Sequence, residues 1–482
     1  MPVAALIAFL LAAVLGCATA PKVTAPPLDW ELPSTWQSVH ATGNVDALSW
    51  TNLADSTLLA LIDEAVTTNW DLRLAASRMT AATAQARIAG APLWPQLQAT
   101  GTTSRRRQNF IGFPIPGGGR DVLTSTTTNN GVSLNLSWEV DLWGRLRAGE
   151  AAALAEVMAS GADLRAARLS LAAQTARGYF AVIEARTQAE LARETLDNQR
   201  LAYAQIRARY ERGLRPSLDL RLGRSSTATA EAALHQRDQI LDFARRQLES
   251  LLGRYPGASI RAGAQLPQLS EQVPVGLPSE LIRRRPDLVA AERRLAAADA
   301  RLVQARRALY PSISLTASSG RSSEELADLL KGDYSVWNLA ANLTQPLFQG
   351  GRLRGGVEMA EANVEGAVAV FAQSVLRALG EVEGALAAEG YLALQEAALA
   401  ISAEEALAAR RLAEDRYQRG LSDLITMLES QRRAFDAQSR FIAVRRQRLD
   451  NRLDLHLALG GGFEHSLSSN MEPDDSQGSK VQ

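Results

Sequence analysis

The histidines and the single cysteine are the side chains with the most obvious potential for chemistry in this 482-residue sequence. The histidines are far apart, and none lies in an HExxH pattern or another metal-ligand spacing; they are His40, His235, His456 and His465. The glycine run at 117–119 lacks the following Lys-Ser/Thr of a phosphate-binding loop. One cysteine cannot form an internal disulfide or a cysteine-based metal site. We therefore expect no catalytic activity, no metal and no cofactor.

Cys17 instead has the sequence context of a lipid attachment site. It follows an apolar run too short to span a membrane, and Val14-Leu15-Gly16-Cys17 matches the bacterial lipobox, in which the cysteine is lipidated and becomes the first mature residue. The alternatives are a plain signal peptide or a buried cysteine. We predict a lipoprotein signal peptide at 1–16 and a lipidated tether at 17–54. The two residues after Cys17 lack the aspartate associated with inner-membrane retention, which favours an anchor in the outer membrane.

The composition excludes nucleic acid as a partner. The chain has 52 basic and 52 acidic residues, so it carries no net field that would attract a polyanion. Hydrophobic residues make up 46% of the chain, but no uncharged run beyond the N-terminus is long enough for a membrane-spanning helix.

The sequence contains an internal duplication. Two motifs recur at an offset of 207 residues: Gly144-Arg145-Leu146-Arg147 as Gly351-Arg352-Leu353-Arg354, and Tyr210-Glu211-Arg212-Gly213-Leu214 as Tyr417-Gln418-Arg419-Gly420-Leu421. We interpret each copy as a helix, a strand hairpin, a very long helix, a tight turn and a second long helix. The predicted segments are a first repeat at 55–253, a connector at 254–277, a second repeat at 278–460 and a disordered tail at 461–482.

Long helices take up most of each repeat. The helical pattern runs over 146–210 and again over 353–417, which at 1.5 Å per residue is about 100 Å of helix in each case. Each ends at Arg-Gly-Leu and reverses into a second helix. The first helix of the first repeat is expected to run from a cap at Asp55 to about Gly90.

The clearest strand lies at 132–142, where apolar and polar residues alternate without interruption. Its length and alternation match a transmembrane barrel strand, although a half-buried strand in a soluble sandwich has the same pattern. We predict a hairpin partner at 96–106, a loop at 108–130, and a second pair of strands at 312–317 and 337–344. Four strands cannot close a barrel, and an open sheet edge in lipid leaves backbone groups without partners. If the strands span, several chains must share one barrel, and three chains give twelve strands.

The basic run Arg105-Arg106-Arg107 lies beside the first strand of this hairpin. It could bind phosphate, including that of lipid A, or it could be the solvated charged rim of a barrel.

Several motifs together resemble the TolC/OprM-like outer-membrane efflux family, and the NodT-type lipoproteins in particular. The resemblance covers roughly 28–462 and rests on the lipobox, on Arg-Arg-Pro-Asp-Leu at 284–288, on Leu-Thr-Gln-Pro-Leu-Phe-Gln-Gly-Gly at 343–351, and on Ala-Leu-Gly-Gly-Gly at 458–462. It implies a mainly α protein with a transmembrane β part. The fold would be a trimeric 12-stranded β-barrel continued by a 12-helix periplasmic α-barrel, with four strands and two long helical hairpins per chain and an equatorial connector.

The resemblance also implies a function and partners. The chain would be the outer-membrane exit duct of a tripartite efflux system, working as a homotrimer in outer-membrane lipid with a periplasmic adaptor and an inner-membrane RND-type pump. The alternatives are a non-conducting periplasmic coiled-coil adaptor or structural lipoprotein, and a type I protein-secretion duct of the same fold. A membrane fusion protein would have long hairpins but would lack two amphipathic strand pairs.

Two groups of site residues follow from the resemblance. The hairpin tips would dock the adaptor, although the glycines alone are also explained by a tight reversal; the tip residues are Gly213, Leu214, Gly420 and Leu421. A periplasmic gate would lie close to these tips, with three copies of one glutamate forming a negative ring whose like charges raise their pKa. The alternative is that the acids are ordinary solvated helix charges; the gate candidates are Tyr417, Asp219, Asp423 and Glu429.

Overall fold

A computed structural model of the chain describes residues 35–38, 55–110, 123–269, 281 and 284–461. These residues form two compact units. The first unit takes its described residues from Met79–Ser160 and Ala291–Phe371, and the second from 35–78, 161–290 and 372–461. The expected signal peptide, most of the tether and all but one residue of the expected C-terminal tail lie outside the described residues.

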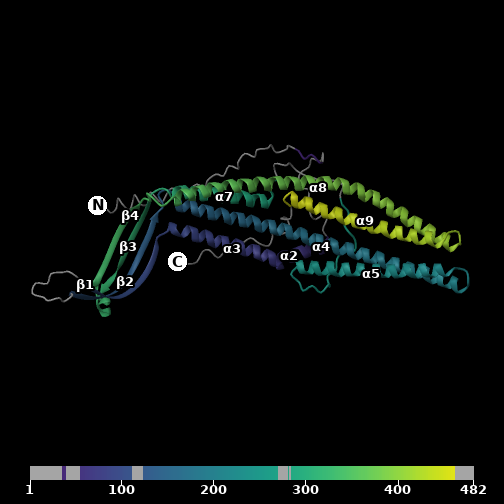
Figure 1. The fold of residues 1–482 in the computed structure, drawn as a ribbon, viewed down its shortest axis with the longest axis horizontal. Coiled ribbons are helices and arrows are strands. Elements are labelled where there is room, and N and C mark those ends of the chain that lie inside the picture. Colours follow the sequence, from purple (N-terminus) through teal and green to yellow (C-terminus); the bar gives the residue numbers. More distant parts are fainter. Residues whose placement is uncertain (1–34, 39–54, 111–122, 270–280, 282–283, 462–482) are drawn as a thin grey trace, which may run out of the picture. The chain divides into compact units, whose positions relative to one another are not determined.

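The four longest helices have the same lengths in the two repeats (Figure 1). Helices α4 (Arg145–Glu211) and α8 (Arg352–Gln418) have 67 residues each, and α5 (Ser217–Leu251) and α9 (Leu424–Ala458) have 35 each. The sequence predicted α4 and α8 to within one residue at each end. Both helices are rich in alanine, which has the highest intrinsic helix propensity.

The first helix of the first repeat differs from the prediction, because it is broken into α2 (Ser56–Thr68) and α3 (Trp70–Gly90). Asn69 between them has an extended backbone. Its side-chain oxygen accepts a hydrogen bond from the backbone N–H of Leu72 at 3.0 Å, and its amide nitrogen donates to the carbonyl of Leu251 at 2.9 Å. A side chain that caps one helix and bonds a distant one favours the break over a continuous helix.

The core of the second unit lies where the long helices pack together. Tyr179, Phe180 and Ile183 of α4 are almost fully buried, as are Leu386 of α8 and Leu449 of α9. Burying each such side chain stabilises the fold by about 1.5–3 kcal/mol. The counterpart of α3 in the second repeat is α7 (Pro286–Arg307), and the described part of the connector, 254–269, contains neither helix nor strand.

A short stretch of the N-terminal region is attached to α8. Trp36 is buried, and the carboxylate of Glu383 accepts hydrogen bonds from the backbone N–H groups of Gln37 at 2.7 Å and Ser38 at 3.0 Å. The Ser38 hydroxyl donates to the same carboxylate. Residues 36–38 are thereby fixed to one point on α8.

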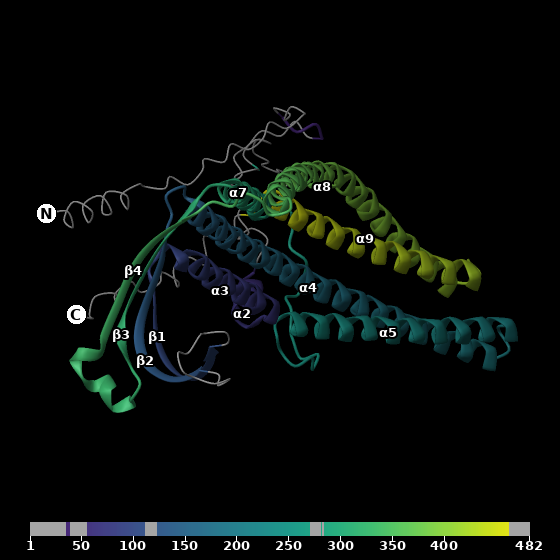
Figure 2. The same cartoon turned by 60° about the vertical axis from the view of Figure 1, so that its left-hand side comes forward.

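The first unit contains a four-stranded antiparallel sheet in the order β1-β2-β3-β4, which Figure 2 shows as one curved layer. The strands are β1 (Gln96–Phe110), β2 (Leu123–Val140), β3 (Ser312–Ser323) and β4 (Ser335–Thr344). Among the described residues β1 and β4 are the two edges, so each has one side of its backbone without a strand partner there.

The first hairpin is longer than the sequence predicted. The expected loop at 108–130 is wrong over much of its length, because β2 begins at Leu123 and pairs with β1 up to Phe110. The Thr/Ser-rich run at 124–128 is opposite 105–109. Threonine favours strands, and this run extends the ladder although it lacks the apolar alternation of 132–140.

One face of the sheet is apolar and the other polar. The register places Leu97 of β1 opposite Leu136, which is opposite Ala317 of β3, which in turn is opposite Leu339 of β4. The alternate residues are mainly Ser, Thr, Asn and Gln, and they share the other face. Several residues of the apolar face are well exposed in this chain; they include Leu97, Val132, Leu134, Trp337, Leu339 and Leu343.

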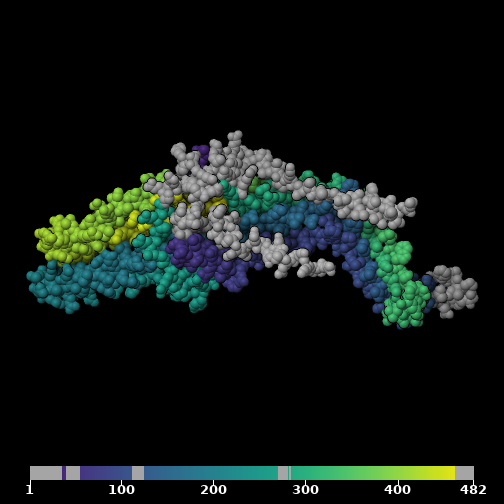
Figure 3. Space-filling model, turned by 180° about the vertical axis from the view of Figure 1, so that it is seen from behind, coloured from purple at the N-terminus to yellow at the C-terminus, as the bar shows by residue number. Residues whose placement is uncertain are grey.

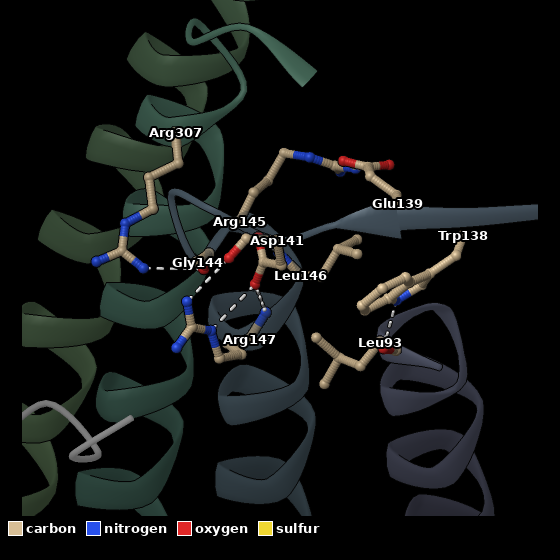
Figure 4. A network of polar contacts seen from close by, with 9 residues as sticks. All are labelled: Leu93, Trp138, Glu139, Asp141, Gly144, Arg145, Leu146, Arg147 and Arg307. Atoms are coloured by element: carbon tan, nitrogen blue, oxygen red, sulfur yellow. Dashed lines mark hydrogen bonds and ion pairs between the residues drawn. The ribbon is translucent and has the colours of Figure 1, made fainter. Parts of the chain in front are cut away.

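The junction between β2 and α4 is a network of polar contacts (Figure 4). The Asp141 carboxylate accepts hydrogen bonds from the backbone N–H groups of Leu146 at 3.1 Å and Arg147 at 2.9 Å, and so caps α4. Arg307 of α7 donates to the carbonyl of Gly144 at 2.8 Å. Two further contacts hold the same region; they are Arg145 to Glu139 at 2.8 Å and the Trp138 indole N–H to the Leu93 carbonyl at 3.0 Å. The sheet and the start of α4 are therefore rigidly connected within the first unit.

The second repeat lacks this cap. Phe348 stands at the position equivalent to Asp141, and both Leu347 and Phe348 are highly exposed in the single chain. The two repeats thus share their elements but differ at this junction.

Within the described ranges, no helix combines the length and the apolar character needed to cross a membrane. Among the described residues, no group of three or more His, Cys, Asp or Glu side chains could hold a metal ion.

Candidate functional site at the hairpin tips

The two long hairpins turn at the same end of the second unit, and Figure 3 shows the two turns next to each other on the surface. Gly213 and Gly420 have φ angles of +73° and +75°, a conformation that favours glycine. In both turns the glycine N–H bonds to the carbonyl three residues earlier, and the leucine N–H bonds to the carbonyl five residues before it. This is the Schellman arrangement of a helix C-terminus, and it explains both glycines.

The leucines after these glycines are not needed for the turns. Leu214 is 67% exposed and Leu421 is 66% exposed. A Schellman turn is commonly accompanied by an apolar contact made by this residue. Here both leucines leave most of their surface free at the end of the unit.

Tyr417 lies in the core of the tips. It is only 2% exposed and packs in a cluster with Ile206, Leu424 and Met427. Its hydroxyl has no hydrogen-bond partner among the described residues. Burial raises the pKa of this hydroxyl, the charge of Arg215 opposes the shift, and Asp219 adds to it.

Two arginines from the first hairpin lie over the Tyr417 ring. The guanidinium carbons of Arg209 and Arg215 are 5.6 and 5.0 Å from the ring centroid, within the range of a cation–π interaction. Arg215 also pairs with Asp219 at 3.8 Å, and Arg209 donates to the carbonyl of Gln418 at 3.1 Å. The two ring contacts and the Arg209 hydrogen bond connect the end of α8 to the first hairpin. Arg215 contacts both Tyr417 and Asp219, so these two gate candidates lie near each other, and their role in a gate stays a prediction.

Asp423 has a structural role in the turn. It is the N-cap of α9, and its carboxylate accepts a hydrogen bond from the backbone N–H of Thr426 at 2.7 Å. This hydrogen bond lowers the pKa of the Asp423 carboxyl. Asp423 was predicted as a gate residue, and its role as a helix cap was not predicted from the sequence.

Glu429 is held by two arginines of its own helix. Arg432 donates two hydrogen bonds to it, at 2.8 and 3.0 Å, and Arg433 donates one at 2.9 Å. These bonds lower the pKa of Glu429 to about 2. The direction is opposite to that expected for a ring of like charges. Such a ring requires several chains, so its existence stays a prediction.

The duplicated tyrosines differ in environment. Tyr210 stands in the first repeat where Tyr417 stands in the second, but it is 39% exposed. The arginines at 209 and 215 were not predicted from the sequence, because their contact with Tyr417 is made across about 200 residues of chain. The arginines at 432 and 433 could have been found, since they lie three and four positions after Glu429 on one helix. Cys17 lies outside the described residues.

Comparison with known proteins defines the class to which this fold belongs. The sequence profile of the outer membrane efflux proteins matches residues 61–254 and 277–461. Outer membrane protein OprJ of Pseudomonas aeruginosa is 35% identical over 96% of this chain and 96% of its own length.

Solved structures agree with this match. A membrane protein from Pseudomonas aeruginosa superposes with a TM-score of 0.84 at 34% identity, covering 92% of this chain and 98% of the other. The open state of the MtrE outer membrane channel of Neisseria gonorrhoeae superposes with a TM-score of 0.80 at 30% identity, covering 92% and 98%.

The chain belongs to the outer membrane efflux protein family. It is an outer-membrane channel protein of an efflux system and not an enzyme, and its fold is the helical duct with a β part that these channels share.

Proposed function

We propose that three copies of this chain form one exit duct, with a shared twelve-stranded barrel in the outer membrane and a twelve-helix tunnel in the periplasm. The observation that carries the trimer is the sheet, which has an apolar face and two unpaired edges, β1 and β4. In lipid the backbone groups of both edges need partners, and β4 of one chain can supply them to β1 of the next. The exposed Tyr210, Leu347 and Phe348 are apolar surface that neighbouring chains can cover.

The particle mass tests the assembly. Protein extracted in detergent should have three times the mass of the mature chain, and it should form ion-conducting pores in a planar bilayer. A homogeneous monomer that keeps its folded strands would refute the proposal.

The tips are the proposed contact with a periplasmic adaptor, which would link the duct to an RND-type inner-membrane pump. Support comes from Leu214 and Leu421, which are two exposed apolar side chains on glycine turns that do not need them. Replacing both leucines with glutamate should abolish adaptor crosslinking and export while the trimer persists. The matched control is Arg212→Ala, which changes an exposed side chain at the tip of the first hairpin. Unchanged crosslinking in the double variant would contradict the docking assignment.

The same region is the proposed gate. Arg215 of the first hairpin lies over the Tyr417 ring of the second and pairs with Asp219 of its own hairpin, so a pore that opens by separating the hairpins must break the contact between Arg215 and Tyr417. We assign the closed state to this cluster, whereas Asp423 contributes as a helix cap and Glu429 as part of a charge cluster with Arg432 and Arg433.

Lipidation of Cys17 is the proposed second attachment to the outer membrane. Mass spectrometry of the mature protein should find an acylated N-terminal cysteine, and Cys17→Ser should remove the lipid. Because the barrel also holds the protein in the membrane, the serine variant should still insert once exported. An unmodified Cys17 in the mature protein would contradict the lipobox assignment.

A further inference from the structure

The basic run at 105–107 has an arrangement in the sheet that the duct function does not explain. Successive side chains of a strand point to opposite faces. Arg105 and Arg107 therefore share the face of Leu97 and Ala99, which is the apolar face, and Arg106 lies on the polar face. Two of the three arginines therefore lie on the surface that carries the apolar side chains, beyond the last apolar residue.

The strand register gives the position of these arginines along the strand, relative to the apolar rows, which are the lines of apolar side chains opposite one another across the sheet. Arg105 is opposite Thr128 and Arg107 is opposite Thr126, whereas the last apolar residue of β2 is Val132. At about 3.4 Å per residue, Arg105 is roughly 14 Å and Arg107 roughly 20 Å beyond Val132 along the strand.

The apolar rows themselves match the height of a membrane. They extend over β2 from Val132 to Val140, nine residues that span roughly 27 Å along the strand, and a tilt of about 40° reduces this height to roughly 20 Å. The lipid-facing band of outer-membrane barrels is about 25 Å tall. With the same tilt, Arg105 is roughly 10 Å and Arg107 roughly 16 Å beyond Val132 along the membrane normal. Both arginines are thus placed outside the hydrocarbon, on the headgroup side, at the end of the sheet away from the helix junctions.

The surroundings of the arginines fit an anionic ligand. Both are exposed, and neither has an ion-pair partner among the described residues. The hydroxyl-bearing Thr126 and Thr128 of β2 are opposite them, on the same face. A third arginine, Arg321 of β3, is opposite Val132 at the last apolar row, and its Nη1 donates to the Leu329 carbonyl at 2.9 Å, which leaves the other guanidinium donors for a ligand. Guanidinium groups bind phosphate through two parallel N–H donors, which a planar arginine is well shaped to provide.

We propose that Arg105 and Arg107, with Arg321 beside the last apolar row, form a binding site for the phosphate groups of lipids in the outer leaflet of the outer membrane. The proposal rests on the proposed insertion of the sheet as a barrel with its apolar face toward lipid. The ligand is a membrane lipid, because the arginines lie on the face that continues the lipid-facing surface.

The test compares two arginine variants that differ in the face they alter. Wild type, the double variant Arg105→Gln/Arg107→Gln and the single variant Arg106→Gln are purified in a phosphate-free detergent and stripped of lipid. Each is titrated with phosphorylated lipid A in mixed micelles and, separately, with inorganic phosphate, and binding is read by native mass spectrometry. We expect the double variant to lose at least tenfold in lipid affinity and Arg106→Gln to bind as wild type does. Inorganic phosphate should bind much more weakly than the lipid.

Two results would overturn the proposal: equal lipid binding by the double variant and wild type, or equal binding of inorganic phosphate and lipid. A second variant, Arg105→Lys/Arg107→Lys, keeps both charges and should retain an intermediate affinity, which guards against a double variant that does not assemble. Particle mass and pore conductance are measured on the same samples. A monomer or a non-conducting wild type would refute the duct itself, whereas a conducting trimer without lipid binding would refute only this site.

Discussion

Removing Arg215 should open the proposed gate, because this side chain makes one of the contacts between the hairpins. Its guanidinium carbon lies 5.0 Å from the centroid of the Tyr417 ring, whereas its ion pair with Asp219 at 3.8 Å is made within the first hairpin. A cation–π contact of this kind contributes about 1 kcal/mol. Arg215→Ala should therefore weaken the link between the hairpins by about 1 kcal/mol in each chain.

A trimer that opens in one concerted step multiplies this effect by three. The sum is about 3 kcal/mol, and since every 1.4 kcal/mol is a factor of ten, the open-to-closed ratio should rise by about 10². Single-channel recording in a planar bilayer measures this ratio directly. A variant with the resting conductance and open probability of wild type would refute the assignment of the closed state to this cluster.

Two controls separate the ring contact from other effects. Arg212→Ala removes a positive charge at the same tip but keeps both arginines that lie over the Tyr417 ring. This variant should conduct as wild type does. Tyr417→Phe keeps the ring under both arginines and removes a hydroxyl that has no partner among the described residues. This substitution should leave the gate closed, because an unpaired buried hydroxyl contributes nothing favourable.

Three further perturbations test the same region and the core beneath it. Asp423→Ala should lower the stability of the second hairpin by about 1 kcal/mol in thermal unfolding, whereas Asp423→Asn, which can still cap α9, should not; altered conductance in the asparagine variant would argue for a gate charge instead. The folded-state pKa of Glu429, about 2, is below its unfolded value of 4.5, so its stabilising contribution is present above pH 4.5 and is lost only as pH falls through 2. Ion selectivity measured from pH 7 to 4.5 should therefore be constant, and a titration in that window would indicate a repelling ring. Burial, together with the charge of Arg452, lowers the pKa of His456 from 6.5 to about 4. The unfolded state therefore takes up the proton at a higher pH than the folded state. The free energy of unfolding should fall as the pH drops from 6.5 toward 4, by on the order of 3 kcal/mol. His456→Gln should flatten this pH dependence of the melting temperature, and an unchanged slope would show that another group titrates.

The elements that the sequence predicted well are those with a strong local signal. The alternation at 132–140 indicated β2, and the repeated Arg-Gly-Leu motif marked both turns, because a positive φ at Gly213 and Gly420 is a local demand. The extension of the hairpin over 123–130 was missed, since its strand character comes from pairing with β1 and not from an apolar face. The break at Asn69 was missed for a similar reason, as half of its hydrogen bonding is to α5.

The candidate site shows the same division between local and long-range signals. Motif matching identified Tyr417 and Asp219, but it could not show that Arg209 and Arg215 cover the ring, because those contacts exist only when the two hairpins pack together. Asp423 was assigned a charge role although its position two residues after the glycine turn is that of a helix cap.

The attachment of residues 37–38 to Glu383 limits how far Cys17 can lie from α8. Cys17 and Gln37 are 20 positions apart, and an extended chain of that many residues reaches about 70 Å at most. If Cys17 carries the proposed lipid, the membrane surface must lie within about 70 Å of Glu383 for both attachments to be held at the same time. Each residue deleted between Cys17 and Trp36 would shorten this reach by about 3.5 Å.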